Sequence, residues 1–319
     1  MVTSDKTCRT ANGYDINGFD QLKDGRGNIC PVTIILPTIA MEANKDIYNF
    51  MSLLSRKIDE AKDMLIERFN WICSQSPNSA SFMYQNNVMA GYVPEEGIYS
   101  ALKHGTLAIG QIGLSETLYI LLGKNHTTDE GMKWAKKIEQ LFKEKCSTFK
   151  EQYKLNFGVY YTPAENLCYT SMKKFKEKYG IIPNVSDREY FTNSIHVPVW
   201  YNCNAFEKIN IESQLTGYSS AGCITYVELP STVNHNLKAL ESIVLYAMNK
   251  DIPYFAVNVP VDNCTNCGAS GEFGETCPEC GSNKIDRLRR VTGYLTGDYK
   301  TAFNYGKQCE TNDRVKHEK

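Results

Sequence analysis

The spacing of apolar residues predicts two long helices. Between residue 44 and about residue 74, apolar side chains recur every three or four positions, which places them in one stripe on a helix surface. The members of this stripe are Ile47, Phe50, Met51, Leu54, Ile58, Ala61, Leu65, Phe69 and Ile72. A second stripe, over residues 129 to about 153, consists of Trp134, Ile138, Leu141, Phe142 and Phe149. A shorter helix is expected over residues 232–249.

Short runs rich in Val, Ile and Thr lie between the helices and are typical of β-strands. We expect strands over residues 28–40, 107–114, 156–162, 194–201, 222–229 and 254–261. Because strands and helices alternate along the chain, the fold class is predicted to be α/β with largely parallel strands. The sequence changes in character at Asp262, so residues 1–261 are expected to form the main α/β domain and residues 262–319 a small cysteine-containing module.

Composition and charge argue against several classes of protein. The chain has 319 residues, enough to bury a sizeable core, and its formal net charge of -1 gives no indication of a nucleic-acid or anionic-membrane surface. The first residues lack the apolar core of a secretory signal, and no run of about 18 apolar residues suggests a membrane helix. We therefore expect a cytoplasmic protein whose 12 cysteines are reduced rather than paired in disulfides.

Four of the cysteines form two Cys-x-x-Cys-Gly motifs. Cys264 and Cys267 make up the first motif, and Cys277 and Cys280 make up the second. Four thiolates at this spacing are typical of a tetrahedral zinc site, although an iron site or a redox-active dithiol would use the same cysteines. The glycine after each motif allows a tight turn that directs backbone N–H groups at the sulfurs. Because four thiolates leave no coordination position open, we expect a structural Zn²⁺ that holds the following segment in place.

The segment behind the motifs contains a glycine with two interpretations. Residues 289–295 read Arg-Arg-Val-Thr-Gly-Tyr-Leu, and on their own they predict only a turn with positive φ at Gly293. However, the Arg-Val-Thr-Gly-Tyr-Leu string, its place behind the cysteine motifs and the Phe-Asn-Tyr-Gly-Lys sequence of residues 303–307 resemble one family, the anaerobic (class III) ribonucleoside-triphosphate reductases. The resemblance implies that Gly293 carries a glycyl radical, installed by a separate S-adenosylmethionine-dependent activase. Glycine suits this role because a Cα radical without a Cβ can flatten and delocalise into both flanking amides.

A second part of the resemblance lies near the start of the chain. Cys8 stands in a Cys-Arg-Thr context and is followed by a Gly-Asn pair and a strand, which is similar to the surroundings of the family's relay cysteine. This implies that Cys8 forms a thiyl radical that abstracts the 3′-hydrogen of the ribose, and that Asn28 hydrogen-bonds the substrate. The alternative for Cys8 is a terminal thiol with no role. Radical transfer between Cys8 and Gly293 requires their reacting atoms to approach to about 3–3.5 Å.

Residues 162–165 predict the start of a helix. Thr162 suits the N-cap, Pro163 suits the first helical position, and Glu165 completes a capping box. The structural interpretation is a plain cap. The resemblance implies instead that Thr162, Pro163 and Ala164 bind the substrate phosphates, because the free N–H groups and the dipole of a helix N-terminus favour anions.

Two histidines lie in further segments that resemble the family. His104 belongs to residues 103–113 and is expected to be a structural histidine. In the same segment, Gln111 departs from the large apolar residue that is more usual. His196 belongs to residues 192–200, and both a structural role and a place in a pocket are open for it.

The resemblance also implies a fold, of which this chain would supply a part. The chain would form the C-terminal portion of the ten-stranded glycyl-radical-enzyme α/β barrel, with a small C-terminal zinc-ribbon module and a radical loop. An N-terminal half, on a separate polypeptide or in a longer chain, would complete a homo-oligomeric enzyme that reduces ribonucleoside triphosphates with formate or a redoxin as electron donor. No nucleic acid and no membrane is expected as a partner. Two alternatives stay open, namely another glycyl-radical enzyme of the formate-lyase type and a non-catalytic zinc-ribbon binding protein.

Overall fold

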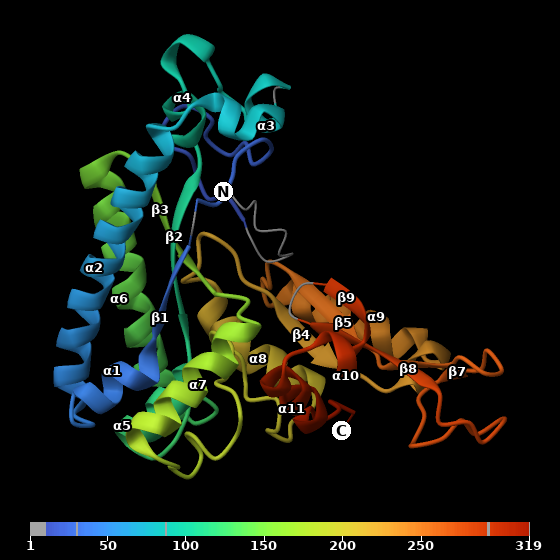
Figure 1. Cartoon of the computed structure of the whole chain (residues 1–319). Coiled ribbons are helices and arrows are strands. Elements are labelled where there is room, and N and C mark those ends of the chain that lie inside the picture. The colour runs from blue at the N-terminus through green and yellow to red at the C-terminus, as the bar shows by residue number, and fades with distance from the viewer. Residues whose placement is uncertain (1–10, 30, 87, 292–293, 319) are drawn as a thin grey trace. The chain divides into compact units, whose positions relative to one another are not determined.

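The computed structural model describes residues 11–29, 31–86, 88–291 and 294–318 (Figure 1). The chain divides into two compact units. Unit 1 consists of Met1–Thr162 and Gly217–Cys223, and unit 2 consists of Pro163–Thr216 and Ile224–Lys319. The domain division expected at residue 262 falls inside unit 2 and stays a prediction.

Unit 1 is built around a parallel sheet of three strands in the order β1-β2-β3. Strand β1 is Val32–Ile35, β2 is Thr106–Ile112 and β3 is Asn156–Tyr160. Every residue of β2 and β3 is buried. Near-continuous burial of this kind is usual in parallel sheets, whose strands read as apolar runs rather than as alternating patterns.

The segment Gly217–Cys223 lies along the outer edge of β3. The backbone N–H groups of Ser220 and Ala221 both donate to the carbonyl oxygen of Val159, at 3.2 and 2.9 Å. Although it is separated from the rest of unit 1 in sequence, this segment therefore satisfies the edge of the sheet.

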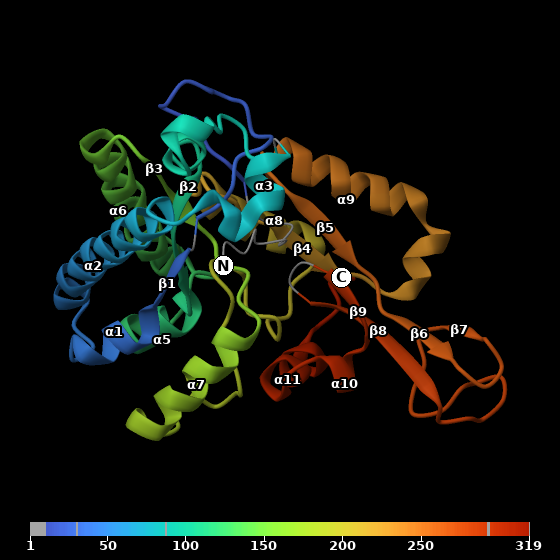
Figure 2. The ribbon, with the colours of Figure 1, turned by 45° about the horizontal axis from the view of Figure 1, so that its top comes forward.

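Two long helices pack against the sheet, as the sequence predicts. Helices α2 (Ile47–Cys73) and α6 (Asp129–Tyr153) lie side by side along it in Figures 1 and 2. Most of the predicted apolar stripe of each helix is buried. The side chains of Asp46 and Thr128 cap the two helices by accepting hydrogen bonds from backbone N–H groups three residues further on.

The remaining elements of unit 1 are short. They are the helices α1 (Leu36–Glu42), α3 (Ser81–Gln85), α4 (Tyr99–Leu102) and α5 (Leu114–Leu122), with the 3-10 turns η1 (Pro77–Ala80) and η2 (Pro94–Glu96). The strand predicted over residues 28–40 is too long, because α1 follows β1 directly. Pro37 lies in the first turn of α1, where its missing N–H costs no helix hydrogen bond. A short apolar run does not distinguish a strand from a buried helix by its pattern alone.

Unit 2 contains a pair of parallel strands, β4 (Thr225–Glu228) and β5 (Phe255–Asn258). Helices α8 (Ala205–Thr216) and α9 (Leu237–Asn249) pack against this pair, and α9 runs beside β5 in Figure 2. The shared core consists of Ala205, Ile209, Val227, Leu229, Ile243 and Ala247. Helix α7 (Asn166–Tyr179) precedes α8 in the chain.

The strand predicted at residues 194–201 is wrong, since this described stretch folds as turns. The N–H of His196 donates to the carbonyl oxygen of Asn193 (3.0 Å), and the N–H of Tyr201 donates to that of Pro198 (2.9 Å). Pro198 has no N–H for a strand ladder, and local turns satisfy the backbone instead.

The helix predicted over residues 232–249 begins later than expected. Ser231–His235 forms a 3-10 turn, η3, and α9 starts at Leu237. The reason lies in Asn236, whose side chain accepts a hydrogen bond from the N–H of Ala239 (3.1 Å) and so caps the helix.

The C-terminal part of unit 2 forms an antiparallel sheet in the order β7-β6-β8-β9. Its strands are β6 (Val261–Cys264), β7 (Ser270–Gly271), β8 (Ile285–Val291) and β9 (Tyr294–Asp298). Two short helices follow, α10 (Tyr299–Ala302) and α11 (Tyr305–Asp313).

The fold is therefore mixed α/β, as predicted, with parallel pairing within the β1-β2-β3 sheet and within the β4-β5 pair. None of the helices in the described ranges combines the length and apolar character needed to span a membrane.

Candidate functional site

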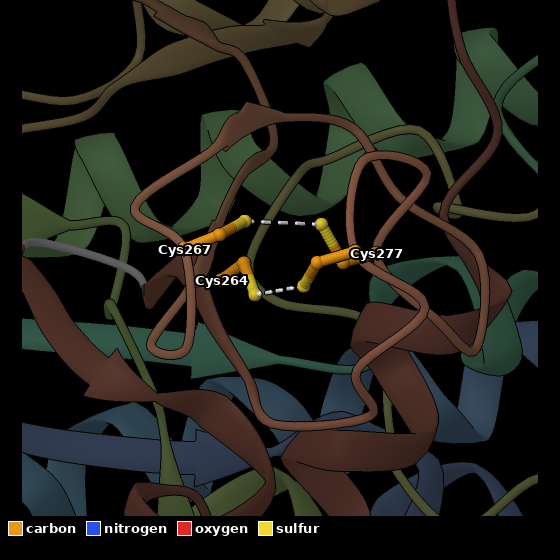
Figure 3. A group of neighbouring side chains, drawn as sticks. Cys264, Cys267 and Cys277 are labelled. Carbon is orange, nitrogen blue, oxygen red and sulfur yellow. Dashed lines mark hydrogen bonds between the residues drawn. The ribbon is translucent and has the colours of Figure 1, made fainter.

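The two Cys-x-x-Cys motifs bring four sulfur atoms together in unit 2 (Figure 3). The Sγ atoms of Cys264, Cys267, Cys277 and Cys280 all lie within 4.8 Å of one another. The Cys264–Cys280 and Cys267–Cys277 Sγ distances are both 3.6 Å. Zn–S bonds of about 2.3 Å in a tetrahedron place the sulfurs about 3.8 Å apart. The cluster therefore fits a zinc ion.

Both motifs fold into the same turn. Gly268 donates its N–H to the carbonyl oxygen of Cys264, and Gly281 donates to that of Cys277, at 2.9 Å in each case. Their φ angles are 77° and 70°, in the region that favours glycine. The N–H of each first cysteine donates to the carbonyl oxygen five positions later, at 2.8 Å in both motifs. The glycines predicted to shape the turns therefore do so.

The surroundings of Cys280 favour its ionised form. Hydrogen bonds from the side chain of Asn266 and from the N–H of Ser282 lower the pKa of the Cys280 thiol to about 6. The Asn266 Nδ2 atom lies 3.5 Å from the sulfur. Because the thiolate is the form that binds metals, this environment suits a metal ligand.

A buried aspartate joins the loop between the two cysteine motifs to β8. Asp262 is fully buried, and its carboxylate accepts hydrogen bonds from Arg289 Nη1 (2.7 Å) and Arg287 Nη1 (3.1 Å). It also accepts one from the N–H of Phe273 (2.8 Å), in the loop between the two motifs. One carboxylate thus fixes both that loop and the strand that leads toward residue 293.

Both residues of the predicted radical relay, Cys8 and Gly293, lie outside the described residues. On either side of Gly293, strands β8 and β9 pair in antiparallel fashion, with Val291 opposite Tyr294. The close approach of Cys8 and Gly293 stays a prediction.

Asn28 lies in unit 1 beside the start of β2. Its neighbours anchor the backbone there, since Ile29 N–H donates to the carbonyl oxygen of Thr106 (2.7 Å) and Thr106 N–H donates to that of Gly27 (2.8 Å). The Asn28 side chain is 5% exposed, and neither Nδ2 nor Oδ1 has a hydrogen-bond partner among the described residues. An unpaired buried amide costs about 1–3 kcal/mol, so this group has unused capacity for a ligand.

His104 has the structural role expected for it. Its Nδ1 atom lies 2.7 Å from the Asp15 carboxylate, and its ring stacks on Phe19 with 3.9 Å between centroids. Burial opposes the ionisation of Asp15, but hydrogen bonds from His104 and Asn156 hold the pKa of Asp15 below its usual value. The buried pair fastens the segment around Asp15 to unit 1.

The helix start predicted at residues 162–165 is wrong in its local structure. Helix α7 begins at Asn166, and its N-cap is Glu165, where no side-chain cap is present in the described structure. The hydroxyl of Thr162 instead lies 2.9 Å from the hydroxyl of Thr33 in β1. Gly110 of β2 leaves room for this contact, because a Cβ at that position would clash with the Thr162 hydroxyl. The binding role of Thr162, Pro163 and Ala164 stays a prediction.

His196 belongs to a buried polar cluster in unit 2. Its Nδ1 atom lies 3.3 Å from the carboxylate of Glu212, which also pairs with Lys208. Burial opposes ionisation of Glu212, yet the Lys208 and His196 side chains hold its pKa far below its usual range. His196 and Asn193 also line a small cavity of about 10 Å³, close to the space that one water molecule needs. The histidine therefore has a structural partner and also borders a pocket.

The sequence interpretation missed a buried carboxyl group in unit 1. Glu139 of α6 is fully buried and accepts a hydrogen bond from Gln111 Nε2 (2.8 Å). Burial raises the pKa of Glu139 to about 8. Its position between Ala135 and Phe142 on the apolar stripe of α6 is the signal that could have revealed it.

Comparison with known sequences identifies relatives of the chain. A family model described as anaerobic ribonucleoside-triphosphate reductase matches residues 2–317. The anaerobic ribonucleoside-triphosphate reductases of Escherichia coli (strain K12) and Enterobacteria phage T4 are 33% and 35% identical to it, over 97% and 94% of this chain. The matches cover 45% and 50% of those proteins, so the chain spans about half the length of the curated relatives it matches.

Comparison with solved structures shows that the fold of this chain is similar to that of anaerobic ribonucleotide reductases. A chain described as anaerobic ribonucleotide reductase matches with a TM-score of 0.77 at 22% identity, over 93% of this chain and 46% of that chain. The anaerobic ribonucleotide reductase from Thermotoga maritima in complex with dATP and CTP matches with a TM-score of 0.68 at 22% identity, over 94% and 47% of the two chains.

Proposed function

The chain belongs to the family of anaerobic ribonucleoside-triphosphate reductases, and on this premise we propose that it is the C-terminal catalytic part of such an enzyme. The reaction is the reduction of ribonucleoside triphosphates to deoxyribonucleoside triphosphates by glycyl and thiyl radical chemistry. Gly293 stores the radical, Cys8 relays it to the substrate, and Asn28 positions the ribose.

The observation that carries this proposal is the side chain of Asn28. Its amide is buried and has no hydrogen-bond partner among the described residues, which is unfavourable without a ligand. A ribose hydroxyl both donates and accepts hydrogen bonds, so two such hydroxyls can satisfy the Nδ2 and Oδ1 atoms. The resemblance in sequence assigns the same role to this residue.

The substrate phosphates bind at the turn of Thr162, Pro163 and Ala164. The N-cap residue of α7, Glu165, makes no side-chain cap in the described structure, which supports this assignment because a cap at that residue would compete with a phosphate. Such a terminus favours anions. The predicted capping box would have competed with a phosphate for the first N–H groups of the helix. The Thr162 hydroxyl instead contacts Thr33, so this competition is absent.

Residues 262–319 form a zinc-ribbon module and the radical loop. Cys264, Cys267, Cys277 and Cys280 hold a structural Zn²⁺, which the sulfur distances support. When bound, the metal supplies folding free energy to a module with little apolar core. The chain's own contribution is the Asp262 carboxylate, which ties the loop between the cysteine motifs to β8, the strand that precedes Gly293.

Strands β1 to β5 form half of a ten-stranded α/β barrel. The support is that unit 1 contributes three parallel strands and unit 2 two, and one half of such a barrel needs five. Within the described residues, β1, β3, β4 and β5 each pair with one strand only. An N-terminal half, on a second polypeptide or in a longer chain, covers the edges of β1 and β5. The complete enzyme is a cytoplasmic homo-oligomer that a radical S-adenosylmethionine activase activates.

The comparisons favour this function over the two alternatives. Each of the relatives named above is a reductase, which speaks against a formate-lyase-type enzyme. The match over residues 2–317 extends far beyond the cysteine module, which speaks against a zinc-ribbon binding protein alone.

The test is electron paramagnetic resonance spectroscopy of the chain with its N-terminal half, after anaerobic activation with S-adenosylmethionine and the activase. We expect a doublet signal from one hydrogen on the radical Cα, together with deoxynucleotide product. Gly293→Ala should abolish both. Gly274→Ala is the matched control, because a Cβ there meets no atom within 4 Å. Absence of the signal from the complete wild-type assembly would refute the proposal, and a signal without deoxynucleotide would indicate a lyase.

A further inference from the structure

Unit 1 contains an open cavity of about 330 Å³, whose lining includes Thr106, the β-bridge partner of Asn28. Its walls are helix α6, strand β3, the segment 217–220 and residues 13–14. Asn28 and Thr162 do not line it. The volume falls within the range of about 300–1,000 Å³ that is typical of small-ligand pockets.

Two lysines of α6 line this cavity without a carboxylate partner in the described part of the chain. Lys143 Nζ donates a hydrogen bond to the carbonyl oxygen of Gly217 (3.2 Å), and Lys150 Nζ donates to that of Tyr14. No aspartate or glutamate belongs to the described lining. By contrast, Lys145 of the same helix pairs with a carboxylate at 2.8 Å. The two ammonium groups therefore give the cavity a positive lining, which attracts anions, although the nearby Asp15 carboxylate offsets part of the charge of Lys150.

The two ammonium groups are held at the cavity by aromatic rings. The Tyr218 ring centroid lies 5.7 Å from Lys143 Nζ, and the Tyr14 ring centroid lies 5.5 Å from Lys150 Nζ. Seven residues along a helix correspond to about 10.5 Å, so both lysines lie on one face of α6, two turns apart. Ser147 lies between them on the same face and adds a hydroxyl group to the lining.

The wall opposite α6 is held in place by backbone contacts. Gly158 of β3 allows the segment 217–220 to approach closely, because a Cβ there would come within 2.9 Å of the Ser220 hydroxyl and 3.1 Å of the Ala221 Cβ. The hydroxyl of Ser219 donates to the carbonyl oxygen of Val159 (2.9 Å). A wall fixed in this way lowers the conformational entropy that ligand binding would lose.

We propose that this cavity binds a small anion that carries phosphate groups. Lys143 and Lys150 contact phosphate oxygens as separate point charges, and Ser147 donates a hydrogen bond between them. The distance between the lysines selects an elongated anion with more than one phosphate. An adjoining hollow of about 470 Å³ shares Ser147 and Lys150 and is also lined by Glu151 and Lys154, which leaves room for a group attached to the phosphates. The proposed anion site uses none of the residues assigned to the reductase reaction, so the proposal does not depend on that assignment.

Isothermal titration calorimetry on the whole 319-residue chain tests this proposal. The probes are pyrophosphate, CTP and cytidine, and each is titrated into the wild type and into Asn28→Ala. Lys143→Met combined with Lys150→Met should weaken pyrophosphate binding by at least about tenfold, the loss expected for charge-assisted hydrogen bonds. The matched control is Lys133→Met combined with Lys137→Met, two exposed lysines of the same helix that lie outside the cavity.

Several outcomes decide the matter. No binding of pyrophosphate or CTP to the wild type, or an equal loss in the control pair, overturns the proposal. Loss of pyrophosphate binding in Asn28→Ala also overturns it, because the anion would then occupy the substrate site. If the lysine pair fails to fold, Ser147→Glu places a negative charge at an exposed position in the lining and should likewise abolish binding. Tighter binding of CTP than of pyrophosphate, without binding of cytidine, identifies a nucleotide. Equal affinities for CTP and pyrophosphate identify the phosphate chain as the recognised group.

Discussion

Asp262 and Arg289 are joined by a hydrogen bond of 2.7 Å between a carboxylate oxygen and Nη1. Asp262 lies in β6, the strand that ends at the first cysteine of the cluster, and Arg289 lies in β8, which runs toward Gly293. The pair couples the position of the cysteine cluster to the position of the predicted radical loop. A metal site that takes no part in the reaction can in this way still affect the reaction, by fixing the position of the predicted radical loop.

Asp262→Asn should separate this coupling from metal binding. The substitution keeps the size of the side chain but leaves two largely buried arginines without a counter-charge. We expect the free energy of unfolding to fall by about 3 kcal/mol in urea denaturation, because breaking a buried ion pair leaves a charge unpaired. The radical yield of the complete enzyme should fall while the zinc content stays the same. Asp286→Asn removes an exposed carboxylate of β8, the strand of the two arginines, and should change neither quantity. Equal behaviour of the two variants would contradict the coupling.

Removal of the metal should unfold the cysteine module locally. With Cys277→Ser, the zinc content measured by atomic absorption should fall from about one ion per chain to near zero, since three ligands hold the ion far less tightly than four. Limited proteolysis should then cut within residues 262–291, and a strong chelator should have the same effect on the wild type. Cys73→Ser, in α2, should leave both readouts unchanged. Full retention of zinc in Cys277→Ser would show that the cluster is not the metal site.

Asn28→Ala should affect stability and activity in opposite directions. The variant removes a buried amide that lacks a partner in the described structure, so the free energy of unfolding should stay the same or rise by about 1 kcal/mol. Activity of the complete enzyme should fall by more than about 100-fold, as expected when a substrate-positioning group is lost. Denaturation in urea and deoxynucleotide formation measure the two effects. A variant that is clearly less stable than the wild type would indicate a structural role for the amide.

Glu139 should make unit 1 less stable at high pH. Its pKa is about 8 in the folded chain, raised by burial, against about 4.3 in an unfolded chain. Protonated Glu139 stabilises the folded chain. This stabilisation is complete at pH values below the pKa of the unfolded chain, and it is lost as the pH rises to the pKa of the folded chain. Relative to Glu139→Gln, the wild type should therefore lose about 1.4 kcal/mol per pH unit between about pH 5 and pH 8.

The difference between the two unfolding free energies, measured by urea denaturation at several pH values, isolates the contribution of this carboxyl group. Glu144→Gln, at an exposed position of the same helix, serves as the control. A pH-independent difference between Glu139→Gln and the wild type would show that Glu139 ionises normally.

Local periodicity explains which parts of the fold could be predicted. The apolar residues of α2 follow one another at helical spacing from Phe50 to Ile72, so that helix needs no information from elsewhere in the chain. The cysteine cluster is equally local, because two short motifs contain all four sulfurs and both turn glycines. Parallel pairing also followed from the alternation of helices and strands.

Long-range contacts explain what could not be predicted. Thr162 has the sequence signature of an N-cap, but its hydroxyl lies against that of Thr33, 129 positions away. Likewise, Glu139 accepts a hydrogen bond from Gln111, which lies on a different element. The unpaired state of the Asn28 amide is a property of its folded environment, so the sequence could assign this residue a role only through resemblance. The cavity at Lys143 exists because the segment 217–220 folds back onto β3.

The return of Gly217–Cys223 to unit 1 limits how the chain can be dissected. A truncation after Thr162 would retain all three strands of the first sheet, yet it would remove the donors that Ser220 and Ala221 supply to β3. The bared strand would then offer its backbone to any neighbouring molecule. Isolation of this half for biophysical work therefore calls for a graft that keeps the seven-residue return segment, joined to Thr162 through a short flexible linker.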